Sequence, residues 1–287
     1  MQGQRASVRV LAGNLVMAAA KYLAGALSGS AAMMADALHT ASDAVTTVGV
    51  IVGLQVAKRP ADEDHPYGHG RAESVVAKLL GIILIIVAAS VMTGAIGRIL
   101  RHEYEVPGIL ALWAAVVSIL VKEAMARYTA FVGKTINSPA MLADAWHQRS
   151  DALSSVAAFI GILGARNGFL WMDPAAAVVV AIMIGVVGSK IVMASVHEMM
   201  DRQSDRGFAD RVAEIARSVV GVQAVHGVAV RWYGAYAQID LRIGVYPATP
   251  VADGHEIGRR VQQRIRSEIN QVSNVFIHLN PAERGEG

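Results

Sequence analysis

Six apolar stretches dominate the first 200 residues of this chain, and each is about as long as the path across a lipid bilayer. They cover roughly 8–28, 32–56, 76–100, 107–131, 140–164 and 172–199, close to the ~20 residues that a helix needs to cross a ~30 Å hydrocarbon core. Of all residues, 54% are hydrophobic and 17% are charged, whereas soluble proteins carry about 25% charged residues. We therefore predict an all-α bundle of six transmembrane helices over residues 1–203.

The positive charges predict the orientation, because cytoplasmic loops are enriched in Lys and Arg. The first span has no small-residue cleavage site, so we expect it to be kept as a helix. A cytoplasmic N-terminus places seven cations on that side against three on the other: Arg5, Arg9, Lys58, Arg59, Arg71, Arg127 and Lys134 against Arg98, Arg101 and Arg166. We predict a multi-pass protein of the inner (plasma) membrane, or of a membrane derived from it, with both termini in the cytoplasm.

One phrase occurs twice, in the second and fifth spans. Residues 35–44 read ADALHTASDA and residues 143–152 read ADAWHQRSDA, with seven of ten positions identical. An offset of three spans reverses the direction of crossing, so the two helices should run antiparallel. Inverted repeats of this kind place a binding site near the middle of the membrane in transporters.

Each copy of the phrase carries a His and an Asp four residues apart, which places both side chains on one face of a helix. Ionisable groups in mid-span cost roughly 2.5–3.5 kcal/mol each on insertion scales, so they are seldom kept without partners or a task. Two imidazoles and two carboxylates can form a tetrahedral site for Zn²⁺, and they also suit Fe²⁺, Mn²⁺ or Cd²⁺. The predicted ligands are His39, Asp43, His147 and Asp151. The alternative is a pair of structural tethers between helices.

Asp36 and Asp144 precede the two His residues by three positions, on the same helical face. They either orient an imidazole through a hydrogen bond, or line the access path, or lie near the end of a span and meet water.

The chain has no Cys and a net charge of +3. The first excludes disulfides and thiolate ligands, and the second is too small to indicate a nucleic-acid partner.

The region after the sixth span is predicted to be a small α+β domain over 204–287. We expect a helix over 208–220, a hairpin of 225–233 and 236–246, a helix over 252–270 and a strand over 274–280, in the order αββαβ of a metallochaperone-like fold. Alternate residues of the second strand are apolar and should face a core, which points Gln238 and Asp240 the other way.

Taken together, these motifs resemble the cation diffusion facilitator family along nearly the whole chain. The resemblance rests on the paired HxxxD motifs, DEDHPYGHGRAES, NSPAMLADAWHQRSDALSS, WMDPAAA and the soluble tail. It implies a homodimeric metal/proton antiporter that alternates between inward and outward access and usually exports metal. EYEVPGILALWAA and RWYGAYAQIDLRIGVYP are similar to the iron/zinc branch, including its magnetosome members. Those members depart from the His–Asp pattern in span two, so His39 favours Zn²⁺ while Fe²⁺ stays open.

The resemblance also implies a second site in the loop after span two. Asp62, His65 and His69 lie within eight residues, and Pro66 and Gly68 allow tight folding. The alternative is a solvated turn. By resemblance, Arg71 pairs with Asp201 to hold the membrane and tail parts together; otherwise the two form a generic surface pair worth ~0–1 kcal/mol.

Family members bind regulatory metal in the tail. Here Asp240 stands where some relatives carry His, and Asn280 where some carry Asp. These departures disfavour a tight two-metal cluster, and they leave a weaker site of Asp240, His255 and His278, at a dimer interface, or scattered surface polar groups.

We therefore predict a homodimeric divalent metal/proton antiporter that exports Zn²⁺ from the cytoplasm, with Fe²⁺ as the alternative main substrate. Its partners are the lipid bilayer, protons, metal ions and a second copy, with no nucleic acid. No prosthetic group is expected, and metal is substrate and regulator. A transport-inactive sensor or scaffold is the rival. An enzyme is disfavoured because the chain has no HExxH motif.

Overall fold

The computed structural model describes residues 2–57, 59–135, 139–202, 206–233 and 236–282. These residues form two compact units. One comprises Met1–Val52 with Val76–Met193, and the other comprises Gly53–Val75 with Ala194–Gly287. The domain boundary predicted at 203/204 lies outside the described residues.

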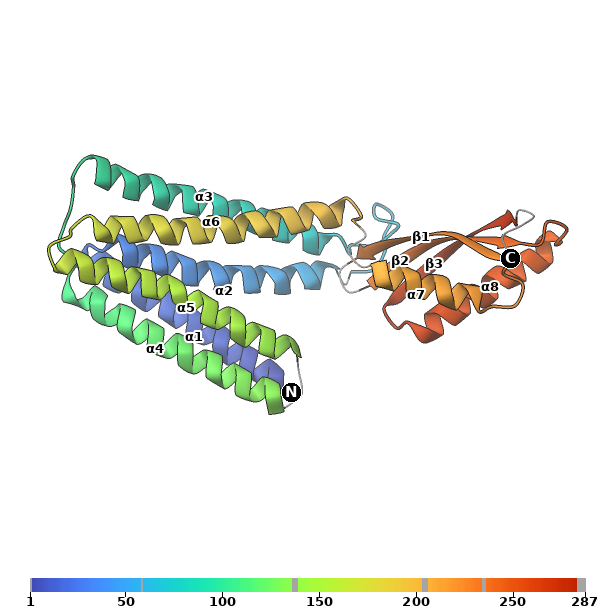
Figure 1. The fold of residues 1–287 in the computed structure, drawn as a ribbon, viewed down its shortest axis with the longest axis horizontal. Helices are drawn as coiled ribbons and strands as arrows, with labels where there is room; N and C mark the ends of the chain where they lie inside the picture. Colours follow the sequence, from blue (N-terminus) through green and yellow to red (C-terminus); the bar gives the residue numbers. More distant parts are fainter. Residues whose placement is uncertain (1, 58, 136–138, 203–205, 234–235, 283–287) are drawn as a thin grey trace. The chain divides into compact units, whose positions relative to one another are not determined.

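Six long helices precede the tail, and Figure 1 shows them side by side. They are α1 (Gln2–Ser28), α2 (Ala31–Ala57), α3 (Ala72–Leu100), α4 (Ile109–Thr135), α5 (Pro139–Arg166) and α6 (Met172–Met199), each containing or closely matching one predicted span. Among the described residues, five stretches are long and apolar enough to cross a membrane: Arg9–Ser28 and all of α2, α3, α4 and α6. Large apolar side chains such as Leu27, Ile86 and Phe131 are exposed on their outer faces, as expected for surfaces that meet lipid.

Helix α5 differs from the other five in its polar first half. It is 28 residues long, but Asp144, His147, Arg149 and Asp151 fall within eight residues of it. Its second half is apolar and contributes Ala158 and Ile162 to a buried cluster with residues of α2, α4 and α6. That α5 also crosses the membrane stays a prediction.

Helix α2 lies between two groups of helices and contacts both. A buried cluster joins its Ala32 and Met33 to α4 and α5, and another joins its Ala35 to α3 and α6. Figure 1 shows that α2 and α5 run in opposite directions, which confirms the antiparallel arrangement expected from the repeat. The two copies of the phrase therefore face each other across the inside of the bundle.

Glycine allows α3 and α6 to approach closely. A Cβ added at Gly81 would lie 2.9 Å from the carbonyl oxygen of Gly188, and a Cβ at Gly188 would lie 2.9 Å from the carbonyl oxygen of Gly81. Small residues at helix crossings let backbones pack tightly in membranes, where burial of apolar surface from water contributes little. This crossing fixes one side of the bundle around α2.

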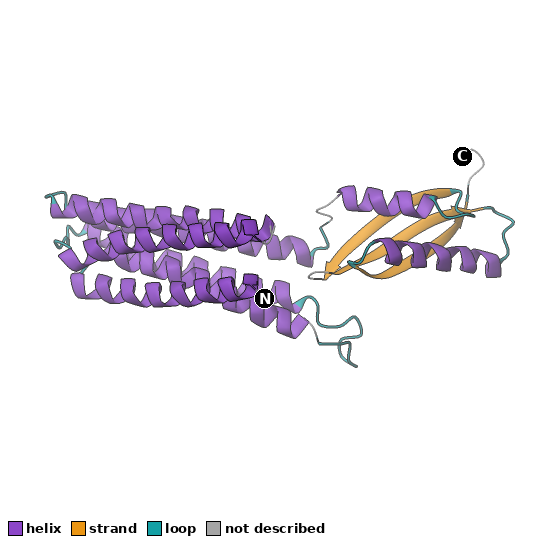
Figure 2. Ribbon diagram, turned by 90° about the horizontal axis from the view of Figure 1, so that it is seen from below, coloured by secondary structure: helices purple, strands orange, loops and turns teal. Residues whose placement is uncertain are grey.

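The tail has the predicted αββαβ order. It consists of α7 (Arg206–Arg217), β1 (Ala224–Tyr233), β2 (Tyr236–Val245), α8 (Val251–Glu268) and β3 (Val272–Pro281). The sheet order is β1-β2-β3, with β1 antiparallel and β3 parallel to β2. The predicted turn at 234–235 lies outside the described residues. Figure 2 shows both helices against the sheet.

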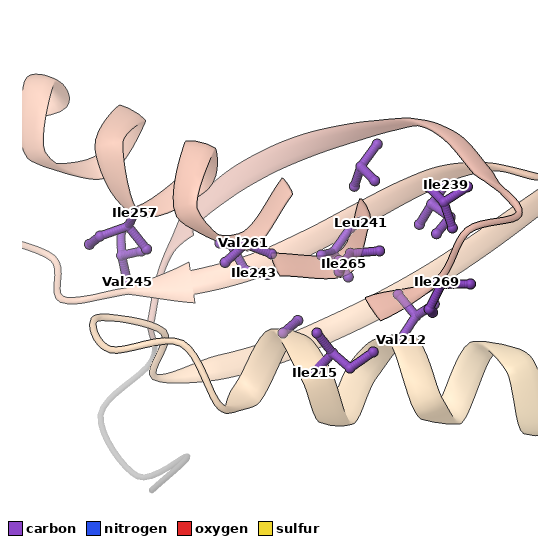
Figure 3. Packing of buried hydrophobic residues seen from close by; sticks show 13 residues of the cluster. Val212, Ile215, Ile239, Leu241, Ile243, Val245, Ile257, Val261, Ile265 and Ile269 are labelled. Carbon is purple, nitrogen blue, oxygen red and sulfur yellow. The ribbon is translucent and has the colours of Figure 1, made fainter. Parts of the chain in front are cut away.

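The core of the tail lies between the helices and one face of the sheet. In β2, Ala237, Ile239, Leu241, Ile243 and Val245 are buried, so the alternation expected from the sequence is confirmed. Figure 3 shows the last four of these side chains beside side chains of the two helices. The helix residues are Val212 and Ile215 of α7 and Ile257, Val261 and Ile265 of α8. Because successive side chains of a strand point to opposite faces, Asp240, between the buried Ile239 and Leu241, lies on the other face.

Candidate metal centre

Three of the four predicted ligands gather where α2 faces α5. His39, Asp43 and Asp151 each offer an atom that lies within 4.8 Å of the other two, and His39 Nε2 is 4.0 Å from Asp151 Oδ1. The fourth residue, His147, has its Nε2 atom 3.7 Å from Asp151 Oδ2, and its side chain is 63% exposed. The structure thus places the other three ligands around Asp151, with His147 at the exposed side.

The imidazole of His39 is buried at the contact between α2 and α5. The residue is 2% exposed, and neither ring nitrogen has a partner among the described residues. Buried polar atoms are nearly always paired because an unpaired one costs free energy. A metal ion bound to His39, Asp43 and Asp151 would supply the missing interaction, since neutral imidazole nitrogen is a good ligand for Zn²⁺.

A small cavity adjoins these ligands. Its volume is about 10 Å³, and its lining includes Asp43 and Asp151 together with Asn14, Lys122, Met125 and Gln148. A space of ~10–15 Å³ holds about one water molecule, so the cavity also suits a single ion. Four helices contribute to it, α1, α2, α4 and α5.

Asp36 forms an ion pair with a lysine and does not orient an imidazole. Its Oδ2 atom is 2.8 Å from the Nζ atom of Lys21, and both residues are fully buried. Lys21 also donates to Thr40 Oγ1 at 2.9 Å and to Ser155 Oγ at 3.0 Å. Ser154 donates to Asp36 Oδ1 at 2.7 Å. The pair therefore ties α1, α2 and α5 together one turn away from His39.

Asp144 has a different setting from Asp36. It is exposed and accepts a hydrogen bond of 2.9 Å from Gln148 Nε2. Gln148 in turn lines the cavity. Asp144 and His147 are thus the two exposed acidic and imidazole groups on the first half of α5.

The polar surroundings of the site also include Lys21, Lys122 and Asn14, none of which belongs to the repeat. The signal in the sequence was their position, because a charged residue in mid-span usually faces the interior of a bundle. Lys21 lies within the first apolar stretch and Lys122 within the fourth. Their partners, however, come from other helices, so spacing along the chain does not reveal them.

The loop between α2 and α3 brings its three predicted ligands together. Asp62, His65 and His69 form a group with ligand atoms within 4.8 Å of one another. His65 Nδ1 lies 3.0 Å from Asp62 Oδ1, and His69 Nε2 lies 3.5 Å from Asp62 Oδ2. The backbone N–H of His65 donates to the Asp62 carboxylate and lowers its pKa. The carboxylate is thereby held in its ionised, metal-binding form.

Arg71 and Asp201 form the predicted ion pair. Arg71 Nη2 is 2.6 Å from Asp201 Oδ1, which joins the loop before α3 to the residue after α6. Arg231 on β1 extends the pair, with Nε 4.0 Å from Asp201 Oδ2 and Nη2 3.1 Å from Asp240 Oδ2. A chain of four alternating charges therefore runs from the loop into the sheet.

The predicted tail ligands are not brought together within one chain, as far as the described residues go. Asp240 and His278 line a concavity of about 440 Å³ on the sheet face opposite to α7 and α8. His255 is exposed on α8, which packs against the opposite face. A site that combines them across two chains stays a prediction.

Comparison with known families matches both parts of the chain. The model of the cation efflux transmembrane domain matches residues 7–200, and that of the cation efflux protein cytoplasmic domain matches residues 205–282. The chain belongs to the cation diffusion facilitator family. It is therefore a membrane transporter of the metal cation efflux class and not an enzyme.

Individual relatives cover most of the chain. Magnetosome protein MamB of Magnetospirillum gryphiswaldense is 33% identical, over 94% of this chain and 91% of its own. Manganese efflux system protein MneP of Bacillus subtilis is 31% identical, over 97% and 96%. Metal tolerance protein 2 of Oryza sativa subsp. japonica is 35% identical, over 96% and 79%.

Proposed function

We propose that the protein exchanges cytoplasmic Zn²⁺ for protons across the inner membrane, with one metal per protomer carried by His39, Asp43, His147 and Asp151. The observation that carries the proposal is the gathering of His39, Asp43 and Asp151 inside a helical bundle. A buried imidazole stands at its centre, and neither of its nitrogens has a hydrogen-bond partner among the described residues. Fixed tethers between helices would instead have paired this group.

The ligand types support Zn²⁺ as the substrate. Two imidazole nitrogens and two carboxylate oxygens match its tetrahedral preference, whereas Mn²⁺ favours oxygen ligands. One relative is named for manganese efflux and another for metal tolerance, so names within the family do not fix the metal. Fe²⁺ is the second candidate, because imidazole and carboxylate also suit it.

Proton exchange follows from the chemistry of the same ligands. Metal binds deprotonated imidazole and carboxylate, so protons and metal compete for one set of atoms. His147 is the exposed member and pairs with Asp151. We propose that it closes onto a metal ion arriving from the cytoplasm, and that protonation on the far side aids release.

The remaining sites are proposed to regulate this exchange. Asp62, His65 and His69 would bind cytoplasmic metal weakly, since all three lie in an exposed loop. The match to the cytoplasmic domain of cation efflux proteins supports a cytoplasmic tail that pairs two copies of the chain. Metal shared between two tails at Asp240, His255 and His278 would act as a regulator only if its affinity differs between transport states.

The test is metal uptake into proteoliposomes that contain the full chain. Zn²⁺, Fe²⁺ under anaerobic conditions, Mn²⁺ and Cd²⁺ are offered separately to the wild type and to Asp151→Ala. Glu123→Ala is the matched control, because this carboxylate lies on α4 but pairs with Arg127 and Arg149 instead of lining the cavity.

We expect rapid uptake of Zn²⁺ by the wild type and by Glu123→Ala, and none by Asp151→Ala. If Asp151→Ala took up Zn²⁺ as fast as the wild type, the assignment of the four ligands would be wrong. Greater uptake of Fe²⁺ would change the metal but keep the mechanism. Binding of metal without uptake of any ion would favour the sensor or scaffold.

A further inference from the structure

Lys122 is a buried cation beside the metal ligands. It lies near the middle of α4 and is 4% exposed. The buried residues of α4 are otherwise small: Ala111, Ala115, Ser118, Ala126, Thr129 and Gly133. A long charged side chain on a face of small residues is costly in a membrane interior, so its presence requires an explanation.

The ammonium of Lys122 bonds a backbone oxygen. Its Nζ atom donates to the backbone oxygen of Asp151 at 3.1 Å, and it makes no ion pair with any carboxylate in the described part of the chain. Lys21 differs, because its ammonium lies 2.8 Å from Asp36 Oδ2. Lys21 is therefore neutralised locally, whereas the positive charge of Lys122 remains available to the site.

That charge lies where the metal would bind. Lys122, Asp43 and Asp151 line the same cavity of about 10 Å³. Before metal arrives, the ammonium offsets part of the charge on the two carboxylates. Once a divalent ion occupies the site, the same ammonium repels it, and this repulsion is strong where the surroundings are apolar.

We propose that Lys122 is a resident cation of the transport site that lowers its affinity for divalent metal and thereby speeds metal release. The inference rests on the proposed function of the four ligands. Lys122 would act through its charge and not as a ligand. It would also stabilise the empty site during the return step, in place of the departed cargo.

A rival explanation is that Lys122 only joins α4 to α5 through its hydrogen bond to Asp151. Three variants separate the two. Lys122→Gln keeps a hydrogen-bond donor and loses the charge, Lys122→Met loses both, and Lys122→Arg keeps both. Lys134→Gln removes an exposed charge from the same helix and serves as the control.

The measurement is the equilibrium Kd for Zn²⁺ of the detergent-purified full chain, by titration calorimetry in a His65→Ala/His69→Ala background, which removes the loop site. At an effective dielectric constant of about 20, the Coulomb repulsion between the ammonium and a divalent ion in the same cavity is larger than the free-energy difference of a tenfold change in Kd. We therefore expect the Kd to fall by about tenfold or more in Lys122→Gln and Lys122→Met. Lys122→Arg and Lys134→Gln should bind as the parent does.

Transport kinetics provide the second measurement. Slower release predicts that both KM and kcat fall in Lys122→Gln, whereas a purely structural clasp predicts that this variant behaves like the parent. An unchanged or higher Kd in Lys122→Gln overturns the inference, as does equal tightening in Lys122→Arg. Asp151→Ala keeps the two proposals apart: if it binds Zn²⁺ as the parent does, the transport site itself is wrong.

Discussion

Replacing Lys21 by Met should destabilise the membrane unit by several kcal/mol. In the wild type, the ammonium lies 2.8 Å from Asp36 Oδ2, and both side chains are at most 2% exposed. Met has a similar length and carries no charge. The substitution therefore leaves the carboxylate of Asp36 buried without its counter-charge.

The expected loss is about 3–5 kcal/mol, the usual cost of removing one partner of a buried ion pair. The Lys21→Met variant also loses the hydrogen bonds that Lys21 donates to Thr40 and Ser155. Replacing both charged residues, as Lys21→Met/Asp36→Leu, should recover most of the loss, because a well-packed apolar pair is often as stable as an ion pair. The two serines that face residues 21 and 36 keep hydrogen-bond partners in the double variant. Ser154 can donate to the backbone oxygen of Asp151, and Ser155 bonds the hydroxyl of Ser118.

Thermal unfolding in detergent, followed by tryptophan fluorescence, measures this difference. The chain has four Trp and no Cys, so intrinsic fluorescence is usable and thiol dyes are not. For a unit of about 200 residues, 3–5 kcal/mol corresponds to a fall in Tm of roughly 6–20 °C. Arg127→Met is the control, because the Arg127 side chain is 79% exposed and pairs with Glu123 at the surface. Such pairs contribute about 0–1 kcal/mol.

Two results would refute this reasoning. The first is a Tm of Lys21→Met equal to that of Arg127→Met, which would mean that the buried pair contributes no more than a surface pair. The second is a double variant as unstable as Lys21→Met alone. In that case the loss would come from packing around residue 21 and not from an unpaired Asp36.

Two further predictions concern the α3–α6 crossing and the loop. Gly188→Val should destabilise the membrane unit by about 1–3 kcal/mol, because a Cβ there meets the Gly81 carbonyl oxygen at 2.9 Å. A Cβ at Gly97 meets nothing within 4 Å, so Gly97→Ala should not lower Tm, since Ala is favoured over Gly in a helix. The lowered pKa of Asp62 comes first from the backbone N–H of His65, so its stabilisation of the turn is complete above about pH 4 and is lost as pH falls through the folded-state pKa. Pepsin should therefore cleave the loop faster, relative to Asp62→Asn, only below that pH; an unchanged ratio would contradict the assignment.

The repeat carried most of the predictive power for the membrane unit. It placed His39, Asp43 and Asp151 on facing antiparallel helices, and the structure brings these three together. Lys122 was not predictable in this way, because its place beside Asp151 depends on how α4 packs against α5. No periodicity along α4 distinguishes a lysine that faces a site from one that faces another helix.

Strand parity predicted the tail correctly, and it also bears on the proposed tail site. It placed Asp240 away from the core, and the structure confirms that the covered face holds Ile239 and Leu241. Helix α8 packs on that covered face, so His255 and Asp240 lie on opposite sides of the sheet. Sequence reasoning grouped His255 with Asp240 in one candidate site, whereas the packing of α8 decides which face of the sheet His255 meets.

Simultaneous recording of Zn²⁺ and internal pH in proteoliposomes tests the central claim most directly. The wild type is compared with Asp43→Ala, and the pH gradient is imposed in each direction. We predict that Zn²⁺ and protons move in opposite directions, that reversing the pH gradient reverses the Zn²⁺ flux, and that both fluxes cease in Asp43→Ala. Zn²⁺ flux without proton movement, or full exchange by Asp43→Ala, would contradict the account.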